Sequence, residues 1–187
     1  MKYLVVGLGN IGEEYKNTRH NIGFKIIDAF AKASQTEFVS GRYADVAETK
    51  FRGNPIFLIK PTTYMNLSGK AVAYWQKQEK IELENILILV DDIALPFAAI
   101  RLRANGSEAG HNGLKSITEC LQTQNYSRLR FGLGNDYPKG GQVDFVLGKW
   151  TDEQEKVIAE KLETTTNAIQ SFVQNGIQRT MNFFNGK

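Results

Sequence analysis

The chain has 187 residues, 42% of them hydrophobic, which suits one globular domain spanning residues 1–187 with a sizeable core. Its formal net charge of +3 is too small to require a polyanionic partner, but it permits one if basic residues gather on one face. No stretch approaches the roughly 20 apolar residues of a membrane helix. The single cysteine, Cys120, can form no internal disulfide. We therefore expect a cytoplasmic protein.

Strand-like and helix-like segments alternate along the chain. Apolar runs predict strands at 3–6, 56–59, 86–90 and 129–133, and alternating patterns predict weaker strands near 43–49 and 100–103. Apolar residues at helical spacing predict helices near 22–30, 72–75 and 114–121, then two more at 152–174 and 177–184, separated by Gly176. Cys120 falls on the apolar face of the third helix, so we expect it in the core.

This alternation, with three continuously hydrophobic strands, predicts an α/β fold whose sheet is covered by helices on both faces. Ligands of such sheets gather beyond the carboxyl ends of the strands. Polar segments follow three of the predicted strands, at 7–20, at 61–68 and at Asp91-Asp92. We expect these three segments to converge on one site.

The segment from Gly7 to Gly12 matches the glycine pattern of dinucleotide-binding folds and follows a predicted strand. In those folds a helix opens at the third glycine and binds the pyrophosphate at its N-terminus. Here Glu13 and Glu14 would repel a phosphate, and the first helix is expected to begin near Asn21. A dinucleotide-dependent oxidoreductase is therefore an alternative that a tight structural turn explains better.

The residues available for chemistry are few. The chain has two histidines, one cysteine, no His-Glu-x-x-His motif and no Gly-x-Ser-x-Gly elbow, so we expect neither a metal site nor a covalent nucleophile. A histidine that activates water remains, and His20 lies in a polar segment beside the predicted cleft. Either Asp91 or Asp92 could accept the proton on its second nitrogen. Neutral amides for orienting substrate or water come from three loops, at Asn10, Asn66 and Asn112.

Basic residues are concentrated between positions 101 and 130, whereas the segment 152–163 is acidic. The basic set is Arg101, Arg103, Lys115, Arg128 and Arg130. A solvated face is the simpler interpretation of this pattern, and a surface for nucleic-acid phosphates is the alternative.

Six segments, taken together and in order, resemble bacterial peptidyl-tRNA hydrolase. They are Gly7 to Gly12, Thr18 to Gly23, Lys60 to Gly69, Asp91 to Pro96, Gly110 to Lys115, and Arg128 to Gly132. The resemblance spans nearly the whole chain and implies one α/β domain with a twisted mixed sheet. It also implies hydrolysis, without cofactor or metal, of the ester between a peptide and the terminal ribose of tRNA, which recycles tRNA after ribosome drop-off.

The same resemblance implies residue roles. His20 matches the family's proton acceptor, Asp91 the carboxylate that stabilises it, and Asn10 the residue that recognises the first peptide N–H. The matching substrate contacts are Tyr15, Tyr64, Asn66 and Asn112, and the matching tRNA-binding surface is Arg101, Arg103, Lys115 and Arg130. The implied partner is peptidyl-tRNA, bound by a monomer.

Three positions depart from the family pattern. Ile11 replaces a usual proline, Ala94 a common acidic residue, and Ala109 a frequent glycine, and these departures put loop stiffness in doubt. A noncatalytic RNA-binding relative is the rival hypothesis. Loss of activity should remove the pressure to keep His20, Asp91 and the asparagines, and that set is complete here.

Overall fold

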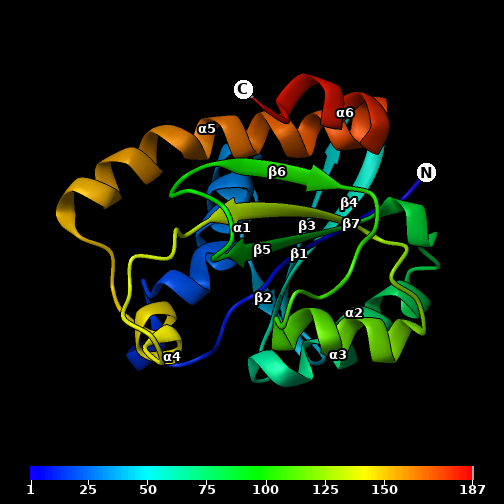
Figure 1. Ribbon diagram of the computed structural model, residues 1–187. Coiled ribbons are helices and arrows are strands. Elements are labelled where there is room, and N and C mark those ends of the chain that lie inside the picture. Colours follow the sequence, from blue (N-terminus) through cyan, green and yellow to red (C-terminus); the bar gives the residue numbers. More distant parts are fainter. Residues whose placement is uncertain (187) are drawn as a thin grey trace.

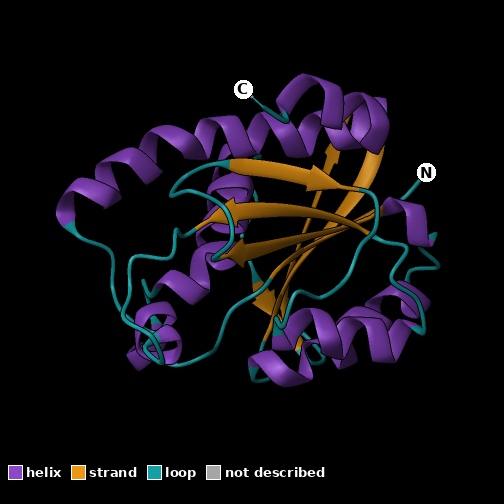
Figure 2. Ribbon diagram, viewed as in Figure 1, coloured by secondary structure: helices purple, strands orange, loops and turns teal. Residues whose placement is uncertain are grey.

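The computed structural model describes residues 1–186, which form an α/β fold around one seven-stranded sheet (Figures 1 and 2). Across the sheet the strands are β2 (Val39–Ser40), β3 (Ala44–Phe51), β4 (Asn54–Pro61), β1 (Tyr3–Gly7), β5 (Ile86–Asp92), β7 (Ser127–Gly132) and β6 (Ile100–Arg103). The four strands β4, β1, β5 and β7 pair in parallel, and the remaining pairs are antiparallel. The expectation of a mixed sheet is therefore confirmed.

Helices cover both faces of the sheet, as expected. They are α1 (Ile22–Ala33), α2 (Ser68–Gln78), α3 (Asn112–Leu121), α4 (Gln142–Val146), α5 (Asp152–Asn175) and α6 (Ile177–Phe184). One cluster of buried side chains joins the sheet to α1 and α5, with α6 packed at its margin, and a second cluster joins the opposite face to α2 and α3. In Figure 1, α5 and α6 run along the top of the molecule, and α2 and α3 lie at its lower right.

The apolar run of β1 shows why the sheet needs helices on both sides. Tyr3 and Val5 point into the first cluster, whereas Leu4 and Val6 point into the second, so every side chain of this strand is buried. The edge strand β6 alternates instead. Its Leu102 is fully buried, and the arginines on either side of it are exposed.

Most predicted elements are confirmed with small shifts of their ends, and the helix at 177–184 has the predicted bounds. Two short elements, β2 and α4, were not predicted. The expectation for Cys120 is wrong, because this residue is exposed. The buried face of α3 is narrower than its pattern indicated and is formed by Leu114 and Ile117, with Cys120 at its margin beside Gly69 of α2.

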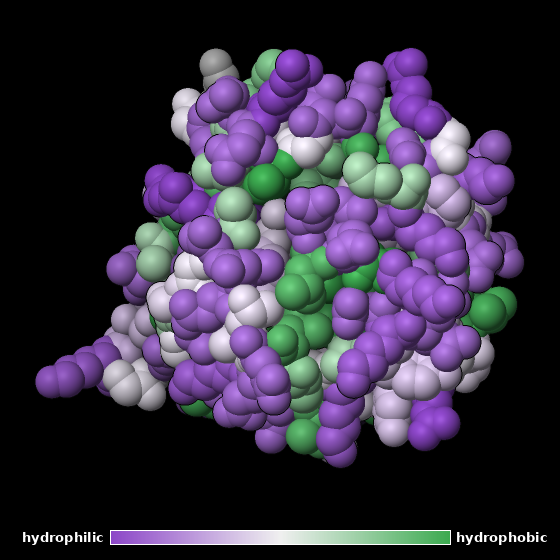
Figure 3. Space-filling model, turned by 90° about the vertical axis from the view of Figure 1, so that its right-hand side faces the viewer, coloured by the Kyte–Doolittle hydropathy of each residue, from purple (hydrophilic) through white to green (hydrophobic). Residues whose placement is uncertain are grey.

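The surface seen in Figure 3 is mostly hydrophilic, with one strip of hydrophobic side chains near its middle. Among residues 1–186, none of the helices is both long enough and apolar enough to span a membrane. The parallel strands β1, β4 and β5 end at Gly7, Pro61 and Asp92, so their carboxyl ends meet at one edge of the sheet.

Candidate active site

The glycine-rich segment at the end of β1 allows this strand to pack closely against α1. The first regular α-helix begins at Ile22, ten residues beyond Gly12, and not at the third glycine as dinucleotide binding requires. A Cβ atom on Gly7 would lie 2.5 Å from the carbonyl oxygen of Gly23 in α1. A Cβ atom on Gly23 would in turn lie 2.6 Å from the backbone nitrogen of Leu8. The glycines let β1 and α1 approach closely.

The same loop positions Asn10. Its backbone N–H donates to Asn21 Oδ1 at 2.8 Å, and Asn21 Nδ2 donates back to the Asn10 carbonyl at 2.9 Å. The side-chain Oδ1 of Asn10 accepts from the backbone N–H of Met65, in the segment after β4, at 2.9 Å. Asn10 therefore joins two of the three polar segments expected to converge, and its Nδ2 donor is left for a ligand.

A pocket of about 340 Å³ opens where these segments meet. Its polar residues include Asn10, His20, Asn66, Asp91, His111 and Asn112. Its apolar side is formed by Met65, Ile93, Val143, Val146 and Leu147. A concave site with a few convergent polar groups and an apolar wall is typical of small-ligand and active sites.

At the centre of the pocket one carboxylate joins both histidines. His20 Nδ1 lies 2.7 Å from Asp91 Oδ2, and His111 Nε2 lies 2.7 Å from Asp91 Oδ1. Asp91 is the last fully buried residue of β5, and the side chain of its neighbour Asp92 turns back to accept from the N–H of Ala94 at 2.8 Å. The geometry thus pairs Asp91, and not Asp92, with His20.

The surroundings set the charge of this cluster. Burial alone would raise the pKa of Asp91, but the two imidazoles, through charge and hydrogen bonds, bring it well below its usual range. For His20, burial lowers the pKa, and the charge and hydrogen bond of Asp91 more than offset this, so the net pKa is raised. The cluster therefore holds an ionised Asp91 beside a histidine of increased basicity.

The tautomer of His111 follows from its neighbours. Its Nδ1 accepts from the backbone N–H groups of Gly113 and Leu114, at 3.1 and 3.4 Å, so it caps the N-terminus of α3. The ring proton is then on Nε2, where it donates to Asp91.

The tautomer of His111 also bears on whether the cluster could bind a metal. The nitrogen and oxygen atoms of His20, Asp91 and His111 lie within 4.8 Å of one another, close enough for a metal to be considered. A metal bound by His111 Nε2 would require that nitrogen to lose its proton while Nδ1 still accepts from the backbone. The donor set therefore fits a hydrogen-bonded triad better than a metal centre.

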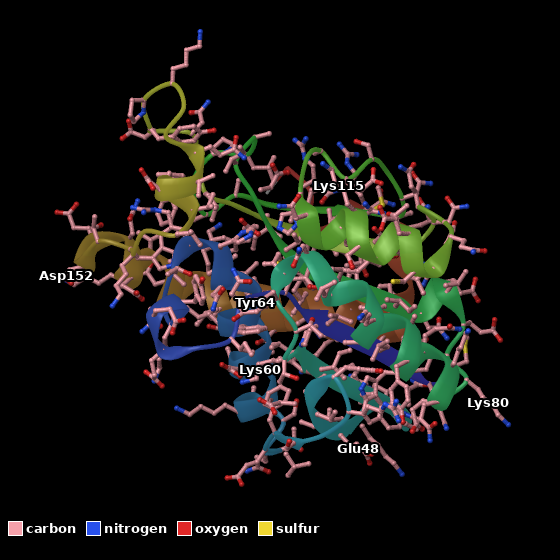
Figure 4. The ribbon with its side chains drawn as sticks, turned by 90° about the horizontal axis from the view of Figure 1, so that it is seen from below. Glu48, Lys60, Tyr64, Lys80, Lys115 and Asp152 are labelled. Atoms are coloured by element: carbon pink, nitrogen blue, oxygen red, sulfur yellow. The ribbon has the colours of Figure 1, made fainter. Side chains whose placement is uncertain are left out.

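Of the four expected substrate contacts, three line the pocket and Tyr15 does not. Asn66, Asn112 and Tyr64 all line the pocket, and the Tyr64 side chain is 59% exposed, near the middle of the view in Figure 4. Tyr15 is not among the residues that line the pocket. Its carbonyl instead accepts from the N–H and the hydroxyl of Thr18, in the turn that leads to His20.

The expected basic surface is partly continuous with the pocket. Arg130 lines the pocket and lies opposite Arg101 in the β6–β7 pair, and Arg103 follows on the same exposed face of β6. Lys115 is exposed on α3 (Figure 4). The charge of Arg130 is partly balanced within the chain, because its Nη1 lies 3.5 Å from Asp92 Oδ2 and its Nη2 donates to the carbonyl of Ser107. Arg128 is the exception within the basic segment, because it is fully buried.

Sequence reasoning missed two features of the pocket. It gave His111 no role, because the helix was predicted to begin near residue 114, whereas α3 begins at Asn112, directly after this histidine. It also missed the apolar wall from α4, although the run from Phe145 to Leu147 is apolar. Among the departures, Ala109 has a positive φ of 51°, which explains why glycine is frequent there.

Known proteins that match this chain give a consistent result. A family model described as Peptidyl-tRNA hydrolase matches residues 4–187. Peptidyl-tRNA hydrolases of Phocaeicola vulgatus and Bacteroides fragilis are 59% and 58% identical to it, each over the full length of both chains. The crystal structure of peptidyl-tRNA hydrolase from Acinetobacter baumannii has a TM-score of 0.92 at 32% identity, covering 98% of this chain and 94% of that one. The chain therefore belongs to the peptidyl-tRNA hydrolase family.

Proposed function

We propose that this protein hydrolyses the ester bond between the peptide and the terminal ribose of peptidyl-tRNA, with His20 as general base on water. The observation that carries the proposal is the 2.7 Å contact between His20 Nδ1 and Asp91 Oδ2 inside the pocket. Because Asp91 holds the proton on Nδ1, Nε2 is the nitrogen that accepts a proton from water. Family membership supplies the substrate class.

In the proposed reaction His20 takes a proton from water as the water oxygen attacks the ester carbonyl. Collapse of the tetrahedral intermediate breaks the bond to the ribose oxygen, which receives the proton from His20. The products are tRNA and the free peptide, whose new carboxylic acid loses its proton to solvent. Asp91 stays ionised throughout, because the two imidazoles hold its pKa well below its usual range. Its carboxylate stabilises the transient imidazolium.

The amides act on the carbonyl groups of the substrate. Asn10 uses Oδ1 to accept from Met65, so its Nδ2 is the group that faces a ligand. We therefore assign Asn10 to donate to a peptide carbonyl, in place of the acceptance from the first peptide N–H that the family resemblance implied. Asn66 and Asn112 line the same pocket and are assigned to the ester carbonyl or the attacking water.

Substrate binding outside the pocket is assigned to Arg101, Arg103 and Lys115, and Arg130 contributes from the lining of the pocket. These contacts would neutralise tRNA phosphates without reading sequence. Tyr64 is assigned to the mouth of the pocket, where its exposed ring can stack on a base or pack against the peptide. Action in the cytoplasm as a monomer belongs to the same proposal.

The decisive experiment measures release of the amino acid from an N-blocked aminoacyl-tRNA by the intact protein and by His20→Ala. Loss of a general base is expected to slow the reaction by about 10²- to 10⁴-fold. Added imidazole should restore part of the rate, because the substitution leaves a space beside Asp91. A rate unchanged by His20→Ala would refute the proposal.

The two rival functions give different outcomes. A noncatalytic RNA-binding relative would bind the same tRNA without releasing the amino acid. A dinucleotide-dependent oxidoreductase would be stabilised against heat by NAD and not by tRNA. Its glycine loop would also need an α-helix that opens at Gly12, where this chain has the one-turn helix Glu13–Tyr15.

A further inference from the structure

We propose that Arg19 is a positioning residue that ties α4, and with it the apolar wall of the pocket, to the segment that carries His20. This inference rests on the proposed function and concerns how the pocket is kept in shape for the substrate. Arg19 makes contacts with α4 and the residues after it that the hydrolytic reaction itself does not use.

The main chain makes the first connection. The backbone N–H of Arg19 donates to the carbonyl of Gly148 at 2.9 Å, and the neighbouring residues Thr18 and Lys149 form an isolated antiparallel bridge. The one-turn helix Arg19–Asn21 is therefore joined to the residues that follow α4. In Figure 1 the short α4 lies at the lower left, beside the blue N-terminal segment.

The side chain of Arg19 makes the second connection. Its Nη1 donates to the carbonyl of Phe145 at 3.0 Å, and its guanidinium carbon lies 4.5 Å from the centre of the Phe145 ring and 5.6 Å from that of Trp150. A planar cation on aromatic faces is a favourable contact, especially when partly removed from water. Phe145 lies in the last turn of α4 and Trp150 four residues beyond its end, so one guanidinium contacts both the helix and the stretch of chain that follows it.

The segment is built to admit this guanidinium. A Cβ atom on Gly148 would lie 2.6 Å from Arg19 Nη1, so a larger residue at 148 would displace the side chain. No carboxylate within residues 1–186 forms a salt bridge with Arg19, so aromatic rings and a carbonyl are its contacts. An arginine serves here through shape and stacking, which a lysine would not reproduce.

The contacts of Arg19 link two parts of the pocket lining. Val143, Val146 and Leu147 form part of the apolar side, and Val143 is 66% exposed. Residue 19 immediately precedes the proposed base, His20, which lines the same pocket. Fastening residue 19 to α4 therefore fixes the distance between the base and the wall against which an apolar part of the substrate packs.

The test compares Arg19→Met, Arg19→Lys and Phe145→Leu with the intact protein, using an N-blocked aminoacyl-tRNA. Arg19→Met should raise KM about 10-fold, because the wall is released while His20 and Asp91 keep their contact. The acidic limb of the pH–rate profile should stay in place. Arg19→Lys should give an intermediate loss, because the ammonium keeps the charge and can reach the Phe145 carbonyl but cannot stack flat.

A double variant tests whether Arg19 acts through Phe145. If the guanidinium acts through the Phe145 ring, Arg19→Met combined with Phe145→Leu should be no worse than the more damaging single change. Amide hydrogen exchange supplies a readout without substrate, because exchange in residues 142–148 should speed up in Arg19→Met. Arg42→Met is the matched control, since Arg42 also stacks on two tyrosines, Tyr43 and Tyr74, but lies outside the pocket.

The outcomes separate this inference from the proposed function. If the intact protein releases no amino acid, the proposed function fails. If the intact protein is active and Arg19→Met matches it in KM and in exchange, only the positioning role fails. Multiplicative losses in the double variant, or a change in thermal stability alone, would also overturn the positioning role.

Discussion

His111 and Asp91 are joined by a 2.7 Å hydrogen bond between Nε2 and Oδ1, on the side of the carboxylate opposite to His20. Asp91 therefore divides its charge between two imidazoles. His111 is a fixed donor because its other nitrogen caps α3, whereas His20 is free to change its protonation during the reaction. The basicity of His20 thus depends on both partners of this triad.

Replacing Asp91 by asparagine should move the acidic limb of the kcat/KM profile to lower pH. In the intact protein the carboxylate raises the pKa of His20 against the effect of burial, so without it burial would dominate and the pKa would fall. The plateau rate should fall by roughly 100-fold or more, because an amide no longer fixes the proton on Nδ1. Activity between pH 4 and 9 with a minimal ester substrate measures both effects. An unaltered profile would mean that Asp91 does not support His20.

Replacing His111 by asparagine should move the same limb in the opposite direction. Asparagine keeps an oxygen that can cap α3 but is too short to reach Asp91, so the carboxylate loses one of its two donors. Its charge would then act more strongly on His20, and the pKa of His20 would rise. We expect reduced kcat/KM near pH 6 and near-normal kcat/KM above pH 8. A limb that stays in place would argue that His111 serves only as a helix cap.

Replacing Arg103 by alanine should weaken tRNA binding and make its salt dependence shallower. Each lost phosphate contact lowers the slope of log K against log salt by about one. A minimal ester that lacks most of the tRNA should be hydrolysed at the normal rate, because Arg103 does not line the pocket. Lys50→Ala is the control. Lys50 is exposed and pairs with Pro55 near the start of β4, at the end of the sheet away from the carboxyl ends of the parallel strands. Equal losses on both substrates would contradict this assignment.

Replacing Ala109 by glycine should stabilise the protein by about 0.5 kcal/mol. Ala109 has a φ of 51°, and the strain of roughly 1 kcal/mol that alanine carries in this region exceeds the entropy that glycine adds to the unfolded chain. Urea denaturation provides the measurement. Ala73→Gly, inside α2, should instead destabilise by about 1 kcal/mol, so the two changes have opposite expected signs. Destabilisation by Ala109→Gly would show that the loop is unstrained.

The sequence predicted those parts of the molecule in which local pattern and burial agree. The apolar run of β5 indicated a strand covered on both faces, and the polar residues after it indicated the edge where the pocket lies. The sequence could not predict α4, because five residues are too few to show a helical period. Nor could it place Arg128, since a cation in a basic segment has the same pattern whether its acceptors are phosphates or carbonyls of its own chain.

The buried guanidinium of Arg128 gives the last prediction. Nη1 donates to the carbonyls of Gly106 and Ser107, and Nη2 donates to those of Gln124 and Tyr126, at 2.8 to 3.4 Å. The guanidinium carbon also lies 4.2 Å from the centre of the Tyr126 ring. Arg128 therefore holds together the loop that leads towards His111 and the turn before β7.

Arg128→Met should destabilise the protein by about 3 kcal/mol, because it removes four hydrogen bonds that are buried or partly buried. Arg103→Met is the matched control, since Arg103 is the direct partner of Arg128 across the β6–β7 pair but is exposed. It should change the free energy of unfolding by no more than about 0.5 kcal/mol. Urea denaturation of both variants at pH 7 measures the difference. If the two variants unfold at the same urea concentration, the carbonyl contacts of Arg128 contribute nothing to stability, and its burial reflects packing alone.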